Sequence, residues 1–116
     1  MVKIPQWFKY KDQNCSIGKH QWSVARIIEL SKDLPVFDAP LNCINLWKRY
    51  DITMREFVMH MKAVMDADLS YPIILDEDGE ILDGRHRVMK ALLEGRKTIK
   101  AVRFDENPHP CRILDD

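Results

Sequence analysis

Apolar residues recur at helical spacing in the first third of the chain. Residues 23–34 carry them every three or four positions, with Ser23 placed as an N-cap and Pro35 directly after the last of them, which predicts a first helix. Residues 26–30 alone are also compatible with a strand. Residues 36–41 are predicted to form an edge strand, because Pro40 cannot donate a hydrogen bond within a central strand.

Residues 42–52 have no apolar period and predict a loop, after which the clearest helical pattern of the chain begins. Thr53 and Glu56 form a capping box at its start. The apolar side chains that follow are predicted to face the core, although a methionine-rich stripe is also compatible with a groove for a partner. The stripe consists of Met54, Phe57, Val58, Met61, Val64 and Met65. His60 lies off the stripe and is predicted to face solvent, without a functional role.

A β-hairpin followed by a helix is predicted in the second half of the chain. Residues 72–75 and 80–82 are the two strands, and residues 76–79 supply a turn whose Gly79 can adopt the positive φ required there. Asp83 and Gly84 end the second strand.

A helix over residues 85–94 follows, and Gly95 fits its C-terminal cap. Val88, Ala91 and Leu92 are predicted to point inward. A last strand is predicted over residues 99–104, and residues 107–116 are predicted to form a tail.

These elements predict an α+β fold with a small mixed sheet and three main helices. The chain has 116 residues, of which 46% are apolar and 31% charged, a size and composition typical of one globular domain over residues 1–116. Residues 1–22 are predicted to be an N-terminal arm or strand. Trp7, Phe8 and Tyr10, interspersed with lysines, either cover an edge of the core or form a stacking platform for single-stranded nucleic acid.

The net charge is zero, with 18 basic and 18 acidic side chains, so charge alone gives no argument for nucleic acid or an anionic membrane as partner. Residues 85–103 are locally basic, with seven basic residues and the single acid Glu94. Either this run is a solvated face, or it marks a binding site for an anion.

The three cysteines, Cys15, Cys43 and Cys111, have no regular spacing and predict neither a disulfide framework nor a zinc site. The chain opens with no secretory leader, and none of its stretches approaches the length of a membrane span. We therefore expect a cytoplasmic protein with no membrane contact.

The segment Asp83-Gly84-Arg85-His86-Arg87 is the strongest candidate for a functional site. A helix that begins at Gly84 or Arg85 directs backbone N–H groups and the positive end of its dipole at one point, which attracts an anion. Arg85, His86 and Arg87 add cationic side chains where they oppose the dipole unless an anion offsets them. This segment therefore predicts a phosphate-binding site.

Each side chain of the segment has a predicted role. Arg85 and Arg87 suit bidentate phosphate contact, and His86 suits phosphate donation or proton transfer. Asp83 suits a helix cap, a partner that orders His86, or a ligand of a metal ion that bridges phosphates. We take His86 and Asp83 as candidate catalytic residues and Gly84, Arg85, His86 and Arg87 as candidate nucleotide-binding residues.

The predicted hairpin, the Asp83-Gly84-Arg85-His86-Arg87 motif, its helix and the closing strand resemble the core of the ParB/sulfiredoxin-like superfamily. The similarity covers residues 53–104, about half of the chain. Its members include partition proteins that bind and hydrolyse CTP through Gly-Glu-Arg-Arg, sulfiredoxins with Gly-Cys-His-Arg, free-serine kinases with Asp-Gly-His-His-Arg, and members described as nucleases. The motif here is nearest to the kinase form.

The resemblance implies a nucleoside triphosphate, ATP or CTP, with Mg²⁺ as ligand, and phosphoryl transfer or triphosphate hydrolysis as activity. Arg85 stands where sulfiredoxins have their reactive cysteine and where partition proteins have glutamate, so sulfinic acid reduction is not expected. Glu29, Asp38 and Asp76 are carboxylates that suit a general base, without a motif to choose among them. A non-catalytic DNA-binding or regulatory module and a metal-dependent nuclease remain alternative functions, and nucleic acid and a second copy of the chain remain open as partners.

Overall fold

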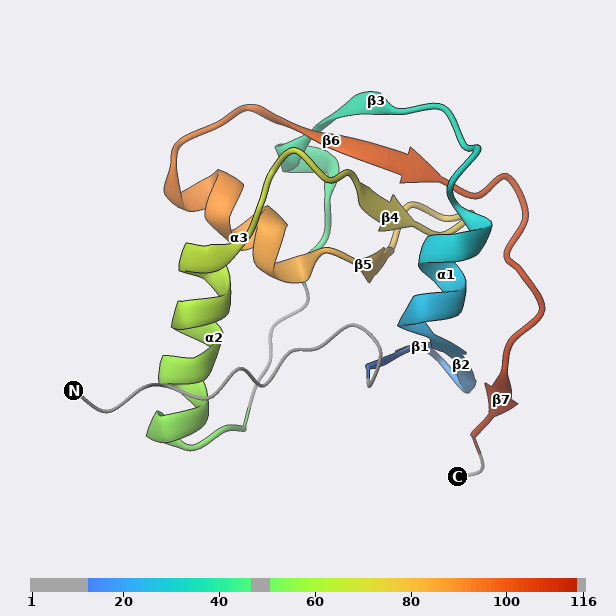
Figure 1. Ribbon diagram of the computed structural model, residues 1–116, viewed down its shortest axis with the longest axis horizontal. Helices are drawn as coiled ribbons and strands as arrows, with labels where there is room; N and C mark the ends of the chain where they lie inside the picture. Colours follow the sequence, from blue (N-terminus) through green and yellow to red (C-terminus); the bar gives the residue numbers. More distant parts are fainter. Residues whose placement is uncertain (1–12, 47–50, 115–116) are drawn as a thin grey trace.

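The structure, a computed structural model, describes residues 13–46 and 51–114, which form two β-sheets and three α-helices (Figure 1). The elements in chain order are β1 (Asn14–Ile17), β2 (His20–Ser23), α1 (Val24–Leu30), β3 (Phe37–Pro40), a short 3-10 turn (Leu41–Cys43), α2 (Met54–Asp66), β4 (Ile73–Leu75), β5 (Ile81–Asp83), α3 (Arg85–Leu93), β6 (Thr98–Arg103) and β7 (Arg112–Ile113). The predicted α+β class and the three main helices are confirmed. None of the described helices is long and apolar enough to cross a bilayer.

The larger sheet has the strand order β3-β6-β4-β5. β4 runs parallel to β6, while β3 pairs antiparallel with β6 and β5 antiparallel with β4. The predicted mixed sheet is therefore confirmed, and β3 lies at an edge as the proline in it requires.

Alternating side chains of this sheet point to opposite faces and pack into two separate cores. Ile73 and Leu75 pack with Val88 and Ala91 of α3 on one face. Ile74 points to the other face. There it joins the apolar side chains of a second cluster, which contains Trp22, Ile27, Leu82, Val102 and Phe104. The sheet is thus covered by α3 on one face and by α1 with β2 on the other, and β5 delivers the chain to α3 at the sheet margin (Figure 1).

The hairpin β4–β5 forms as predicted. Gly79 has φ +83° at the turn, and the carboxylate Oδ1 of Asp76 accepts the backbone N–H groups of Asp78 and Glu80, each at 2.8 Å. Asp76 is buried and holds the turn together.

α1 is shorter than predicted. Ser23 caps it, its Oγ accepting the N–H of Arg26 at 3.5 Å, but the helix ends at Leu30 and residues 31–34 form turns. The helical spacing of apolar residues extends over residues 31–34 although the helix does not, because Leu34 packs against the second core from the turn.

The predicted orientation of α2 is wrong. Thr53 caps the helix as expected, with Glu56 N–H donating to its Oγ1 at 3.1 Å. Met54 is 78% exposed and Met65 67% exposed, and the rest of the predicted stripe except Val64 is also exposed. The buried residues are Met59 and Val64, because the helix carries apolar side chains on two sides and only one side packs toward α3.

The C-terminal segment, predicted as a tail over residues 107–116, contains the short strand β7. β7 pairs antiparallel with β2, which also pairs with β1, so these strands form a second sheet. The Trp22 indole Nε1 donates to the carbonyl of Pro108 at 2.9 Å and fixes the segment before β7. β1 and β2 confirm strand structure within residues 13–22, while the aromatic cluster Trp7, Phe8 and Tyr10 lies outside the described residues.

α3 begins and ends close to the predicted positions. Val88 and Ala91 are buried as expected, but Leu92 is 50% exposed, because the helix contacts the core along one narrow side. Gly95 follows the last turn with φ +72°, and its N–H donates to the carbonyl of Leu92 at 3.0 Å.

Candidate functional site

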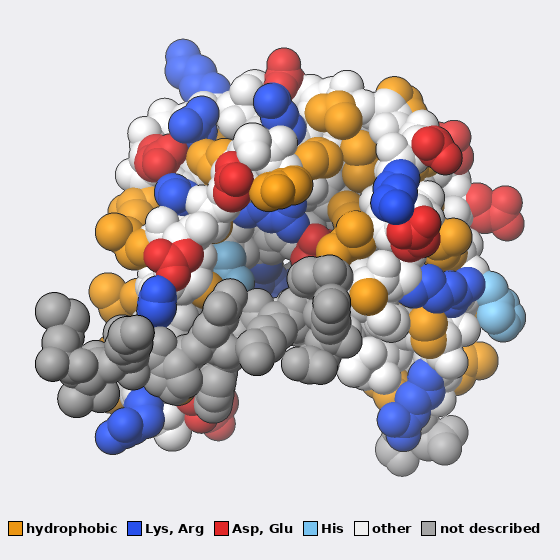
Figure 2. All heavy atoms as spheres, in the orientation of Figure 1, with side chains coloured by type: hydrophobic (Ala, Val, Ile, Leu, Met, Phe, Trp, Pro, Cys, Tyr) orange, Lys and Arg blue, Asp and Glu red, His pale blue; other side chains and the backbone are white. Residues whose placement is uncertain are grey.

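A cavity of about 1110 Å³ lies between β1, α1, α2 and the beginning of α3. Figure 2 shows the corresponding hollow near the centre of the molecule, with basic, acidic and histidine side chains at its margin. All five residues of the predicted motif, Asp83 to Arg87, line this cavity. Among sites for small molecules, volumes of about 300–1,000 Å³ are usual, so this cavity can hold a ligand as large as a nucleotide.

Gly84 sets the position at which α3 begins. It is the N-cap with φ +110° and ψ 19°, and it makes no side-chain capping hydrogen bond. A Cβ atom built on Gly84 would lie 2.5 Å from Cγ2 and 2.8 Å from Cβ of Ile73, which is fully buried. Glycine is therefore required both by the backbone conformation and by the contact with β4.

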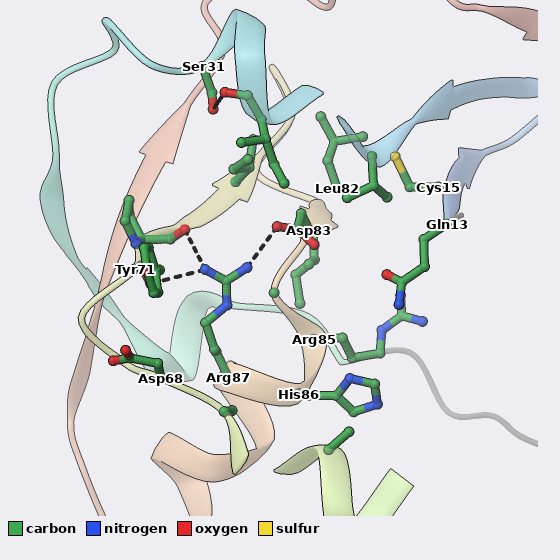
Figure 3. A pocket seen from close by; sticks show the side chains of 18 of the residues that line it. Gln13, Cys15, Ser31, Asp68, Tyr71, Leu82, Asp83, Arg85, His86 and Arg87 are labelled. Carbon is green, nitrogen blue, oxygen red and sulfur yellow. Dashed lines mark hydrogen bonds and ion pairs between the residues drawn. The ribbon is translucent and has the colours of Figure 1, made fainter. Parts of the chain in front are cut away.

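Arg87 and Asp83 form a clamp between three segments. Nη2 of Arg87 donates to Oδ2 of Asp83 at 2.7 Å, and Nη1 donates to the carbonyls of Tyr71 at 3.1 Å and Pro72 at 2.9 Å (Figure 3). The two charged side chains are only 16% and 17% exposed. The pair thus ties the start of α3 to β5 and to the segment before β4, and Asp83 does not cap α3, because Gly84 occupies the N-cap position.

Arg85 points away from Arg87, toward Gln13 (Figure 3). Both arginines line the cavity, but they lie at different parts of it. Arg87 holds Asp83 and two backbone carbonyls together, so Arg85 is the better candidate of the two for a ligand contact.

His86 contacts His60, a residue that the sequence analysis assigns to solvent. Nδ1 of His60 and Nε2 of His86 lie 2.8 Å apart, so one ring donates a hydrogen bond to the other. His60 is half-buried and lines the cavity. The prediction for His60 is therefore wrong. α2 is rotated relative to the predicted orientation, so the apolar stripe is exposed and His60 faces α3.

The surroundings favour neutral imidazoles at this contact. Burial is the main cause that lowers the pKa of His86 to about 4, and neighbouring His60, Arg85 and Arg87 lower it further. Burial also lowers the pKa of His60, with a smaller effect of Arg85 in the same direction and an opposing effect of Glu56. Both effects favour uncharged imidazoles at neutral pH.

The low pKa of His86 predicts a loss of stability in acid. His86 binds a proton near pH 6.5 in the unfolded chain but only near pH 4 in the fold, so between these values the unfolded state holds more protons, and the free energy of unfolding falls as the pH falls. The full shift would correspond to roughly 3 kcal/mol, and partial solvent exposure reduces the expected loss to about 1–2 kcal/mol. Urea unfolding of the wild type and of His86→Asn at pH 7 and pH 4.5 measures the difference. The same pH dependence in both proteins would contradict the assignment.

The carboxylates do not form a metal centre in the part of the chain that the structure describes, where no group of three or more metal-ligating side chains is found. Asp83, predicted as a metal ligand, is paired with Arg87. Of the three carboxylates considered as general base, Asp76 is used in the hairpin turn and Glu29 pairs with Lys32 at 2.8 Å on the surface. Asp38 lies in β3, and none of the three is among the residues that line the cavity.

The cysteines differ in their environments, and all three are free thiols. Cys15 lines the cavity, and burial is the main cause that raises the pKa of its thiol to about 12, with the nearby Asp83 adding to the effect. Such a thiol remains protonated at neutral pH, so Cys15 contributes to the wall of the site rather than to nucleophilic chemistry.

The contact between Asp83 and Arg87 has a local sequence signal. The acid stands four residues before the arginine, the spacing at which opposite charges meet along a helix. Here the pair forms across the helix start, since Asp83 ends β5 and Arg87 lies in the first turn of α3. The contact between His60 and His86 has no such local signal, because 26 residues separate them.

The chain was compared with protein-family models and with curated proteins. No protein-family model matches the chain, and no curated protein matches it.

Proposed function

We propose that the chain is a ParB/sulfiredoxin-like domain whose cavity binds a nucleotide, with the phosphates at the beginning of α3. The observation that carries the proposal is the convergence of Gly84, Arg85 and His86 on one large cavity at the positive end of a helix. The hairpin β4–β5 that leads into α3 supports the resemblance to that superfamily.

In this proposal some side chains of the motif contact the ligand, and others hold the fold together. Arg85 contacts the phosphates through its guanidinium, Gly84 permits close approach to the backbone, and His86 donates a hydrogen bond or moves a proton. Arg87 adds positive charge beside the site, while its Nη donors hold Asp83, Tyr71 and Pro72.

In this proposal Mg²⁺ binds together with the nucleotide and not to the protein alone. Because Asp83 is paired with Arg87 and the described residues contain no group of three or more metal-ligating side chains, these residues do not fit a resident Mg²⁺ site that the protein supplies alone. In proteins Mg²⁺ is commonly held by substrate phosphates and water together with one or two carboxylates. We therefore assign no step of chemistry to a protein-bound metal.

Phosphoryl transfer or triphosphate hydrolysis is the second part of the proposal. It is favoured by His86, which lines the cavity, because an imidazole beside a bound phosphate can donate a hydrogen bond or a proton to the phosphate oxygens. Release of inorganic phosphate from the bound triphosphate separates an enzyme from a nucleotide-binding regulatory module.

Binding is tested by thermal shift with ATP, CTP, GTP, inorganic phosphate and a short DNA duplex, each with and without Mg²⁺. A ligand that binds only the folded state raises the melting temperature. We expect a nucleotide to give the largest shift and Arg85→Ala to weaken its binding roughly 10- to 100-fold, corresponding to the loss of about 1.5–3 kcal/mol for a charge-assisted contact.

The matched control is Arg96→Ala, because Arg96 is also an arginine near α3 but pairs with Glu94 at 2.9 Å outside the cavity. This variant should bind like the wild type. Equal affinity of Arg85→Ala and wild type would overturn the site, and a shift with DNA alone would favour the DNA-binding alternative.

A further inference from the structure

The contact between His60 and His86 joins the two helices at the wall of the cavity. The nitrogen distance is 2.8 Å, and the ring centroids lie 5.1 Å apart with an interplanar angle of 43°. One ring comes from the middle of α2 and the other from the first turn of α3. The proposed phosphate site is therefore bounded by two coupled imidazoles.

A hydrogen bond between two ring nitrogens holds one proton, which limits the states of the pair. In the neutral pair, one imidazole donates and the other accepts, so one of the two outer nitrogens, His86 Nδ1 or His60 Nε2, lacks a hydrogen. In the singly protonated pair, both outer nitrogens carry hydrogens and the hydrogen bond remains. A second added proton would place two N–H groups face to face and break the contact.

Burial is the main cause that keeps the pKa of both histidines low, and the charged groups around the pair modify this effect. From α3, Arg85 and Arg87 oppose protonation of His86, and Arg85 also opposes that of His60. From α2, Glu56 favours protonation of His60. On β5, the carboxylate of Asp83 is paired with Arg87. Cations dominate around His86, and a bound anion would reverse that balance.

We propose that the His60–His86 pair takes up one proton when the cavity binds the dianionic end of a phosphate ligand, with His60 as the positioning residue that accepts the Nε2 hydrogen of His86. The inference rests on the proposed function and specifies it: the preferred ligand ends in a doubly charged phosphate, as a nucleotide does. The proton comes from solvent, and no covalent bond is made or broken.

The physical reason is electrostatic linkage. A dianion next to His86 favours the imidazolium, as opposite charges within about 4–6 Å generally do. His60 makes that state possible without loss of the helix contact, because its Nδ1 accepts the shared hydrogen. Binding and protonation then strengthen each other, so affinity rises as the pH falls.

The experiment is calorimetric titration of ATP at pH 7, in two buffers that differ in ionisation enthalpy. At this pH the terminal phosphate is already mostly ionised, its second pKa being about 6, so proton uptake comes from the protein. A nearby opposite charge raises the pKa of an imidazole by about 1–3, which brings the pKa of His86 from about 4 no higher than the neutral range. We therefore expect uptake of up to about half a proton per ATP, and an affinity that increases up to about fourfold between pH 8 and pH 6.5.

Two variants separate positioning from structure. His60→Phe removes the acceptor, so proton uptake should fall toward zero, and the affinity for ATP should fall about two- to fourfold between pH 7 and pH 6.5. His60→Asn places an amide oxygen near the position of Nδ1 and should restore both, and it serves as the test protein if the Phe variant does not fold. ATP binding without proton uptake in the wild type would overturn this inference and leave the proposed function standing. No binding of ATP or inorganic phosphate to the wild type would overturn both.

Discussion

Gly84→Ala is expected to lower the free energy of unfolding by about 3–5 kcal/mol. The new Cβ would meet Cγ2 of Ile73 at 2.5 Å, and the backbone has φ +110°, a conformation that alanine rarely adopts. Overpacking of a core costs about 1–3 kcal/mol, and a backbone held in a sparsely populated region about 1–3 kcal/mol more. Because Ile73 lies in the middle of the larger sheet, it cannot move aside without disturbing the pairing with β6. Equilibrium unfolding in urea measures the change.

Gly79→Ala is the matched control. Gly79 also has positive φ, +83°, but an added Cβ finds nothing within 4 Å. Only the cost of the positive φ remains, and we expect the free energy of unfolding to fall by about 1–2 kcal/mol. Equal losses in the two variants would show that the approach of Gly84 to β4 is not what sets the beginning of α3.

Arg87→Ala is expected to destabilise the fold by about 2–3 kcal/mol. The substitution leaves the carboxylate of Asp83 mostly buried without its cation, and it removes the donor shared by the carbonyls of Tyr71 and Pro72. Breaking a buried ion pair costs about 3–5 kcal/mol, and we take a smaller value because both side chains retain some contact with water. Urea unfolding at pH 7 gives the value.

Arg96→Ala again provides the comparison, since its pair with Glu94 is largely exposed. We expect less than about 0.5 kcal/mol there. A double-mutant cycle with Asp83→Ala and Arg87→Ala should give a coupling of about 1–2 kcal/mol. A coupling near zero would mean that Arg87 acts through the backbone carbonyls alone, and an unaffected Arg87→Ala would contradict the clamp.

The hairpin and α3 could be predicted from the sequence because their signals are local. Short apolar runs, a glycine in the turn at position 79 and a helix stop at Gly95 all lie within a few residues of the structure they specify. The candidate site was found for the same reason: Gly84, Arg85 and His86 are contiguous, and a helix start brings contiguous residues to one place.

The remainder depends on tertiary contacts that local patterns do not encode. Periodicity identifies which residues of α2 share a side, but the helix has apolar residues on two sides, and the choice between Met59 with Val64 and the exposed stripe is made by packing toward α3. β7 contains two residues and pairs with β2 across some ninety positions of sequence. The prediction for His60 was wrong for that reason, because α2 is rotated relative to the predicted orientation.

Gly84 begins α3 with backbone groups alone, since it has no side chain that could cap the helix. The N–H groups and the dipole of the helix start therefore do not depend on which side chains stand at positions 85 and 86. Substitutions at these two positions should change what the cavity can contact while leaving the beginning of α3 in place, whereas a larger residue at position 84 should displace it.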